Sequence, residues 1–235
     1  REFRTAIHVV DPEDLPIPLG GIARGIGIDY GLDAPYCALW GARLADDLIV
    51  VYREDYGPGY TPAEQAARIL DAEAPGERRP GRPVPAWLDP ATWARNPDKV
   101  RDVNRGPNLP PAGSIADTYR LNGVPVAKAN NDRLAGAADV AARLAVRPDG
   151  RPRLLIYSTC TNLVRTLPAM QRDKRRPEDV DTTGEDHAYD ALRYLLAGLG
   201  RRGGHAPKGD AAGPPPGSRS SVPSSLPARL RSREF

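Results

Sequence analysis

Cysteine is scarce in this sequence, which has only Cys37 and Cys160 among 235 residues. The two form no CxxC pair and no disulfide framework, which excludes a small secreted domain held together by disulfide bonds. We therefore expect a reducing, cytoplasmic setting. Cys160, in the stretch STCTN, has no base beside it in the sequence, so we expect a buried thiol and not a nucleophile.

Several other features are missing. No apolar run is long enough to span a bilayer, and the start of the chain has no signal-peptide pattern. No GxxxxGK[ST] phosphate loop occurs, which excludes an ATP-driven motor within this sequence. The chain opens with REFRTAIHVV and no initiator Met, so we expect a fragment or one domain of a longer protein.

The composition suits one α/β domain with a sizeable core, because 40% of the residues are hydrophobic and 27% are charged. The formal charge of +3 is unevenly distributed. Residues 198–235 contain seven Lys or Arg and two Asp or Glu, whereas the other 197 residues contain 26 basic and 28 acidic side chains. Any affinity for nucleic acid must therefore come from local patches or from this C-terminal segment.

The sequence divides into three parts. Residues 1–20 contain DPEDLPIPLG and are expected to form an extended lead-in. Residues 21–197 carry the hydrophobic patterns of a folded domain. Residues 198–235 are rich in Gly, Pro, Ser and Arg and cannot bury enough apolar surface to fold, so we expect a disordered tail.

The folded part begins with a predicted meander of three strands, in GIARGIGIDYG, PYCALWGARL and DLIVVYRE. A helix follows in TPAEQAARILDAEA, where Thr61 is the N-cap, Pro62 the first helical residue and Glu64 the partner in a capping box. The remaining predicted elements are a strand in RPVPAWLDP, an irregular loop with a short helix over 91–113, a helix in SIADTYRLNG, a strand in PVAKA, a helix over 132–146, a strand over 152–158, a helical segment near 160–171, a loop over 173–183 and a helix opened by Asp186.

This order, βββαβαβα with one further helix before the last, is the ribonuclease H-like arrangement. It predicts an α/β fold in which three antiparallel strands are followed by parallel strands, all in one mixed sheet flanked by helices. Other mixed α/β folds share much of this pattern, so the order alone does not identify the fold.

Three acids stand where the chain geometry can bring them together. Asp29 ends the first strand, Asp89 ends the fourth, and Asp190 lies in the last helix. Adjacent strands that end at the same edge of a sheet bring their terminal side chains close to each other. Three carboxylates so placed repel one another unless a divalent cation lies between them, and oxygen ligands favour Mg²⁺ or Mn²⁺ over zinc. Two such ions can hold the attacking and leaving oxygens of a phosphodiester.

Each acid also has a plainer interpretation. Asp29 stands before a Tyr-Gly pair and would serve as a turn residue. Asp89 precedes a proline and would serve as the N-cap of a short helix in ATWARN. Asp190, in GEDHAYDALRYL, falls opposite the apolar stripe of its helix and would then be a solvated side chain. The residues alone leave both interpretations open.

Six motifs follow one another along the chain: GIDYG, PYCALWG, LDPATW, SIADTYRLNGVPVAKANNDRLAG, RPRLLIYSTCTNLVRTLP and EDVDTTGEDHAYDALRYLL. In this order they resemble the C-terminal nuclease domain of the large terminase subunit of tailed bacteriophages and prophages. The resemblance covers roughly residues 7–197 and leaves out the tail. Single motifs are weak signals, whereas the ordered set is specific.

The resemblance implies a metal-dependent DNA endonuclease that cuts concatemeric viral DNA during genome packaging with two Mg²⁺ or Mn²⁺ ions. Asp29, Asp89 and Asp190 match the three acids of the family. His187 matches a His that modulates metal binding or proton transfer, and Asp186 is a weaker candidate for a ligand. The implied partners are double-stranded DNA, an N-terminal ATPase motor domain, the portal protein and the small terminase subunit, in the cytoplasm of the bacterial host and with no membrane.

Residues that would contact DNA are less clearly marked. The KANNDR stretch joins a strand to a helix N-terminus. Its cationic and amide side chains could bind a DNA phosphate, and these belong to Lys128, Asn130, Asn131 and Arg133. A capped connection, with Asn131 or Asp132 as the cap, is an equally good interpretation. Further cations follow the second acid and precede the last helix, at Arg95, Lys99, Arg101, Arg105, Arg172, Lys174, Arg175 and Arg176. Such charge runs are also typical of solvated surface.

Two rival functions stay open. A Holliday-junction resolvase or transposase of the same fold class would use the same acids, but the SIADTYRLNG and KANNDR motifs argue against it. A degenerate prophage copy would keep the fold and only bind DNA or a packaging partner, and the presence of all three acids argues against that. A titration with Mn²⁺ separates these classes, because a competent metal centre is stabilised by its ion.

Overall fold

The computed structural model describes residues 3–74, 76–77, 83–94, 113–170 and 185–200. Most of the irregular loop predicted over 91–113, the loop predicted over 173–183 and nearly all of the predicted tail lie outside the described residues. Gly198 and Leu199, which the sequence pattern assigns to the tail, instead complete the last helix.

One mixed sheet holds all the described strands: β1 (Val9–Val10), β2 (Ala23–Asp29), β3 (Tyr36–Arg43), β4 (Ile49–Gly57), β5 (Ala86–Leu88), β6 (Val126–Lys128) and β7 (Leu154–Tyr157). Their order across the sheet is β1-β7-β4-β3-β2-β5-β6. β2, β3 and β4 pair antiparallel, and the other described pairings are parallel. The predicted ribonuclease H-like arrangement is therefore confirmed.

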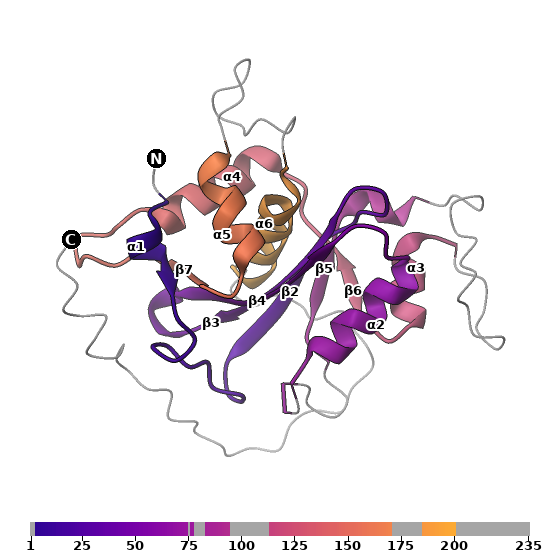
Figure 1. The fold of residues 1–235 in the computed structure, drawn as a ribbon, viewed down its shortest axis with the longest axis horizontal. Coiled ribbons are helices and arrows are strands. Elements are labelled where there is room, and N and C mark those ends of the chain that lie inside the picture. Colours follow the sequence, from indigo (N-terminus) through magenta and orange to yellow (C-terminus); the bar gives the residue numbers. More distant parts are fainter. Residues whose placement is uncertain (1–2, 75, 78–82, 95–112, 171–184, 201–235) are drawn as a thin grey trace.

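The described helices are α1 (Thr5–His8), α2 (Pro62–Ala72), α3 (Ile115–Leu121), α4 (Arg133–Leu144), α5 (Thr161–Thr166) and α6 (His187–Leu199), with 3-10 turns at Ala45–Asp47, Pro90–Trp93 and Leu167–Ala169. α2 and α3 lie on one side of the sheet, and α4, α5 and α6 lie on the other (Figure 1). Among the described residues, no helix is long and apolar enough to cross a membrane.

The lead-in is only partly extended. Its residues form the single turn of α1 and then β1, which pairs parallel with β7 through Val9 and Ile156. A strand of two residues has no periodicity of its own. The pairing with β7, a contact far along the chain, therefore creates this strand, and the local sequence pattern cannot predict it.

The predicted helix starts at Thr61 and Ser114 are confirmed. The Thr61 hydroxyl accepts a hydrogen bond from the Glu64 N–H at 3.3 Å, and the Glu64 carboxylate accepts one from the Thr61 N–H at 2.8 Å. The Ser114 hydroxyl accepts from the Asp117 N–H at 3.2 Å. These bonds satisfy N–H groups that the first turn of a helix leaves without a backbone partner.

Glycines allow α6 to lie directly on the sheet. A Cβ atom at Gly27 of β2 would overlap the Ala191 carbonyl oxygen and come within 2.8 Å of the Leu195 Cβ. A Cβ at Gly41 of β3 would meet the Leu195 side chain at 2.7 Å. This close approach brings the first turn of α6 over the end of β2.

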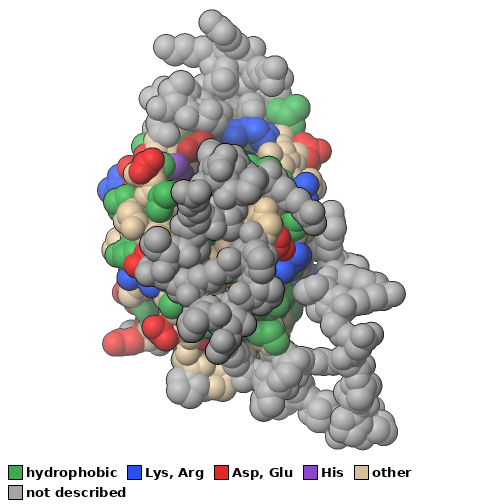
Figure 2. All heavy atoms as spheres, turned by 90° about the vertical axis from the view of Figure 1, so that its right-hand side faces the viewer, with side chains coloured by type: hydrophobic (Ala, Val, Ile, Leu, Met, Phe, Trp, Pro, Cys, Tyr) green, Lys and Arg blue, Asp and Glu red, His purple; other side chains and the backbone are tan. Residues whose placement is uncertain are grey.

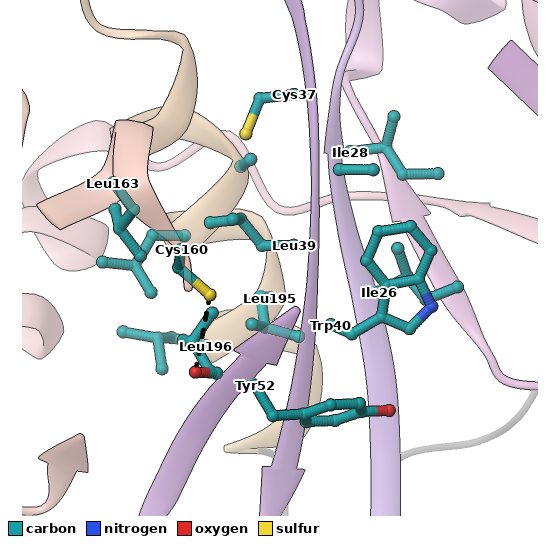
Figure 3. Close-up of a cluster of buried hydrophobic side chains, with 14 of the residues drawn as sticks. Ile26, Ile28, Cys37, Leu39, Trp40, Tyr52, Cys160, Leu163, Leu195 and Leu196 are labelled. Carbon is teal, nitrogen blue, oxygen red and sulfur yellow. Dashed lines mark hydrogen bonds between the residues drawn. The ribbon is translucent and has the colours of Figure 1, made fainter. Parts of the chain in front are cut away.

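The core lies on both faces of the sheet, as Figure 3 shows. Leu39, Leu163, Leu195 and Leu196 fill the face that α5 and α6 cover, and Ile26, Ile28 and Trp40 fill the opposite face. Both cysteines are buried and free, and the Cys160 thiol contacts the Val51 carbonyl oxygen at 3.8 Å. The predicted burial of the Cys160 thiol is confirmed.

Candidate active site

Two of the predicted acids meet at one edge of the sheet. Asp29 is the last residue of β2, and Asp89 directly follows β5. The two strands are parallel neighbours with Ile28 opposite Leu88, and the Asp89 N–H donates to the Ile28 carbonyl at 3.0 Å. The pairing therefore carries both carboxylates to the same end of the sheet.

The start of α6 brings His187 onto the first acid. His187 Nδ1 lies 3.0 Å from Asp29 Oδ2, and the Asp29 side chain is buried. Burial raises the pKa of Asp29 to about 6 although the His187 hydrogen bond opposes the rise, and the charges of Asp190 and Asp89 add to it. The same hydrogen bond raises the pKa of His187. The pair is therefore suited to share a proton.

Asp190 is held by two arginines. Its Oδ1 accepts from Arg193 Nε at 3.1 Å and from Arg193 Nη2 at 2.7 Å, and its Oδ2 lies 3.6 Å from Arg133 Nη1. The Arg193 side chain is 2% exposed and the Asp190 side chain 13%. The interpretation of Asp190 as a solvated side chain is therefore wrong, because it lies in a charged contact between α6 and α4.

Asp89 caps a turn and also lies in the field of another acid. Its carboxylate accepts from the Ala91 N–H at 3.0 Å and caps the turn Pro90–Trp93, as the plainer interpretation requires. Burial raises the pKa of Asp89, and the charge of Asp190 raises it as well. Capping therefore does not remove this acid from the electrostatic field of the other carboxylates.

Asp186 stands directly before α6 and its side chain caps no backbone N–H. Burial raises the pKa of Asp186, and so does the charge of Asp190. The charge of Asp190 thus acts on Asp186 as it does on Asp29 and Asp89.

The chemistry of the donor set fits a hard divalent cation. Burial and the charge of Asp190 raise the pKa values of Asp29, Asp89 and Asp186, a bound cation would offset the repulsion among these acids, and carboxylate oxygens suit Mg²⁺ or Mn²⁺. Within the described part of the chain, however, no three His, Cys, Asp or Glu side chains are close enough together to hold a metal ion. Asp190 faces its arginines, Asp89 faces the Ala91 N–H and Asp29 faces His187, so these contacts would have to loosen for the three carboxylates to share one cation.

The KANNDR connection is capped. Asn130 Oδ1 accepts from the Asp132 N–H at 3.1 Å, and the Asp132 carboxylate accepts from the Ala135 N–H at 3.0 Å. Lys128 and Asn131 are exposed, and Arg133 reaches the acid on α6. The other cations considered for DNA binding, including Arg95 and Lys99, lie outside the described residues.

Sequence reasoning missed one cluster beside the acids. The Tyr56 hydroxyl donates to Glu185 Oε1 at 2.6 Å, and Arg165 Nη1 donates to Glu185 Oε2 at 2.8 Å. The Arg165 and Tyr56 hydrogen bonds lower the pKa of Glu185 to about 2. Tyr56 and Glu185 are 129 residues apart, so no local spacing could have revealed the contact. Only the acidic GEDH stretch hinted at it.

Comparisons with known proteins agree on the fold. No protein-family model matches the chain, and no curated protein matches it significantly. The large terminase of a thermophilic bacteriophage, in complex with ATP-gamma-S, is similar, with a TM-score of 0.61 and 19% identity over 83% of this chain and 44% of that chain. The P22 large terminase nuclease domain is similar with a TM-score of 0.60 and 13% identity, over 83% of this chain and 89% of that chain. The chain therefore has the fold of large-terminase nuclease domains and matches less than half of the thermophilic phage's large terminase.

Proposed function

We propose that this chain is the nuclease domain of a phage or prophage large terminase, a metal-dependent endonuclease that cuts concatemeric viral DNA during packaging. The observation that carries the proposal is the position of Asp29 and Asp89 at the ends of neighbouring parallel strands, with His187 Nδ1 of α6 3.0 Å from Asp29 Oδ2. The chain that carries these residues has a fold similar to that of the P22 large terminase nuclease domain, and the acids come from the strand ends and the helix that the sequence motifs indicate.

In this proposal Asp29 and Asp89 hold one or both of two Mg²⁺ or Mn²⁺ ions, and Asp190 completes the set with Asp186 as an accessory ligand. When bound, such ions supply hydroxide near neutral pH and stabilise the departing 3′ oxygen. The side chains provide the rest: fixed oxygen donors on a rigid sheet edge, and a helix N-terminus that keeps His187 within reach of Asp29.

His187 has a defined role in the metal-free protein. As an imidazolium it donates through Nδ1 to Asp29 and neutralises part of the negative charge there. If Asp29 were neutralised by a bound cation, His187 would lose this stabilisation of its charged form and release the proton, and its neutral ring would then be able to accept one from the reaction. It thereby tunes metal affinity and holds a proton near the cleavage position.

DNA binding in this proposal depends on local contacts. On the face shown in Figure 2, the described Lys and Arg side chains lie among acidic and apolar ones and form no continuous basic patch. The sequence contains no helix-turn-helix motif, so cleavage should be weakly sequence-specific. Double-stranded DNA is the substrate; an N-terminal ATPase motor, the portal and the small terminase subunit are the expected partners in the bacterial cytoplasm.

Cleavage of supercoiled plasmid by the purified chain tests the proposal. Reactions contain Mn²⁺, Mg²⁺ or EDTA, and Asp29→Asn and Asp89→Asn serve as site variants. Nicking that requires metal and disappears in both variants supports the nuclease and its site. Nicking that persists in the variants contradicts the site, and a chain that Mn²⁺ neither activates nor stabilises against heat is a degenerate copy.

A further inference from the structure

We propose that Arg165 and Tyr56 form a binding site for a DNA backbone phosphate beside the acids, and that the Glu185 carboxylate occupies this site when DNA is absent. The inference deepens the proposed nuclease function and rests on it. It adds a substrate contact that the sequence motifs did not indicate.

The contacts on Glu185 are those that a phosphate would receive. Arg165 donates through Nη1 to Oε2 at 2.8 Å and through Nη2 to Oε1 at 2.5 Å, and the Tyr56 hydroxyl donates to Oε1 at 2.6 Å. Paired guanidinium donors bind carboxylates and phosphates in the same two-bond geometry. Asn162 Oδ1 accepts from Arg165 Nη2 at 3.2 Å and helps to orient the guanidinium.

Exposure allows the carboxylate to be replaced. The Arg165 side chain is 56% exposed and the Glu185 side chain 40%, so solvent and ligand can reach both. An exposed ion pair of this kind is weak, and a DNA phosphate can displace the carboxylate at little cost. The other arginines near the acids differ, because Arg193 is buried and Arg133 is directed to Asp190.

The sheet fixes the position of this site relative to the acids. Asp29 pairs with Cys37 across β2 and β3, and Cys37 pairs with Tyr56 across β3 and β4. Directly paired residues point to the same face of a sheet, so the three form one row beneath α5 and α6. Strands are spaced about 4.8 Å apart, which puts Tyr56 about 10 Å from Asp29. A DNA strand that crosses this row with one phosphate at the acids brings another phosphate toward Arg165.

A different role for Glu185 makes the opposite prediction. If its contacts only anchored the start of α6, and with it His187, then neutralising Glu185 would loosen the site and weaken DNA binding. If Glu185 competes with phosphate, the same change strengthens DNA binding. The sign of the effect therefore decides between anchoring and competition.

The experiment measures binding of a short fluorescein-labelled DNA duplex in EDTA, which prevents cleavage, over a series of KCl concentrations. Each phosphate contact contributes about 0.9 to the slope of log K against log[salt]. We expect Arg165→Ala to weaken binding roughly tenfold and to reduce the slope by about one contact. Arg165→Lys should keep the slope and lose part of the affinity, because it keeps the charge without the paired donors. Glu185→Gln should bind DNA several-fold more tightly.

Arg68 and Asp55 provide matched controls. Arg68 and Asp55 form a partly exposed ion pair with two hydrogen bonds, and Asp55, like Tyr56, belongs to β4. Because consecutive residues of a strand point to opposite faces, Asp55 faces α2 on the other side of the sheet from Tyr56. Arg68→Ala and Asp55→Asn make the same changes in charge, so they report the effect of net charge alone. We expect both to leave the salt slope unchanged.

An unchanged slope in Arg165→Ala, with its melting temperature preserved, overturns the phosphate site. Weaker binding by Glu185→Gln overturns competition and supports anchoring. Either result leaves the nuclease proposal standing if the wild-type chain binds and cuts DNA. A wild-type chain that binds no DNA at low salt contradicts both proposals together, and the plasmid assay identifies that case independently.

Discussion

The ring of His187 joins the first residue of α6 to the last residue of β2, with Nδ1 3.0 Å from Asp29 Oδ2. This contact links the helix that carries Asp190 to the strand that carries Asp29. Burial raises the pKa of Asp29 to about 6, so ionisation of this carboxylate at higher pH destabilises the native state, a cost that the proposed metal site would explain. The stability of the site variants should reveal that cost.

Asp29→Asn should stabilise the metal-free chain at mildly alkaline pH. The folded pKa of Asp29 is about 6 against an ordinary 3.8, so the native state favours the protonated form. The penalty is absent below pH 3.8, grows as pH rises, and is complete above about pH 6. Removing the charge should recover about 1–3 kcal/mol at alkaline pH. Urea unfolding of the two proteins across this pH range measures the predicted gain in stability. An Asp29→Asn variant that is less stable than the wild type at alkaline pH contradicts the prediction.

His187 should titrate above its ordinary pKa of 6.5, because the Asp29 hydrogen bond favours the imidazolium. Its contribution to stability is complete below pH 6.5 and is lost as pH rises through the raised pKa. An NMR titration of the His187 ring should show this rise in the wild type and a return toward the ordinary value in Asp29→Asn. Mg²⁺ should lower the pKa of His187 in the wild type and leave it unchanged in the variant.

Gly27→Ala should displace α6 from the sheet. The added Cβ would overlap the Ala191 carbonyl oxygen, a backbone atom that cannot move alone. We expect a loss of about 1–3 kcal/mol or more in thermal unfolding, together with loss of cleavage as His187 moves from Asp29. Gly20→Ala is the matched control, because a Cβ there meets nothing within 4 Å, and it should be neutral. Equal stability of the two variants would show that α6 does not depend on this contact.

Sequence reasoning located the acids because strand ends and caps are local features. The end of β2 at Asp29, the turn after Asp89 and the capping box at Thr61 each depend on a few neighbouring residues. The pairing of β2 with β5 then follows from the common ribonuclease H-like order. These features can be predicted from the sequence because none of them depends on a side-chain contact between residues far apart in the chain.

The surroundings of Asp190 could not be obtained in this way. Helical periodicity predicts one apolar stripe, yet nine of the 13 residues of α6 are buried because the helix lies between the sheet and α4. Arg193 is one of these buried residues. Its side chain packs against Gly136 of α4 and donates hydrogen bonds to Asp190. Whether the polar face of a helix is buried depends on which helix packs over it, and here that helix is α4, about 50 residues earlier in the chain.

Asp190→Ala should destabilise the fold much more than Asp190→Asn. Arg193 is 2% exposed, and removing its carboxylate leaves a buried guanidinium without its counter-charge, which typically costs about 3–5 kcal/mol. Asparagine keeps an oxygen that can accept the Arg193 hydrogen bonds, so Asp190→Asn should lose less stability than Asp190→Ala. Thermal unfolding of the two metal-free variants measures the difference.

Both variants should lose cleavage, but only Asp190→Asn tests the acid itself, because its fold is preserved. The double variant Asp190→Ala/Arg193→Met removes the stranded charge along with the acid and should regain much of the stability without regaining activity. If Asp190→Ala proves as stable as Asp190→Asn, the buried guanidinium has found another partner, and the contact between α4 and α6 does not depend on this ion pair.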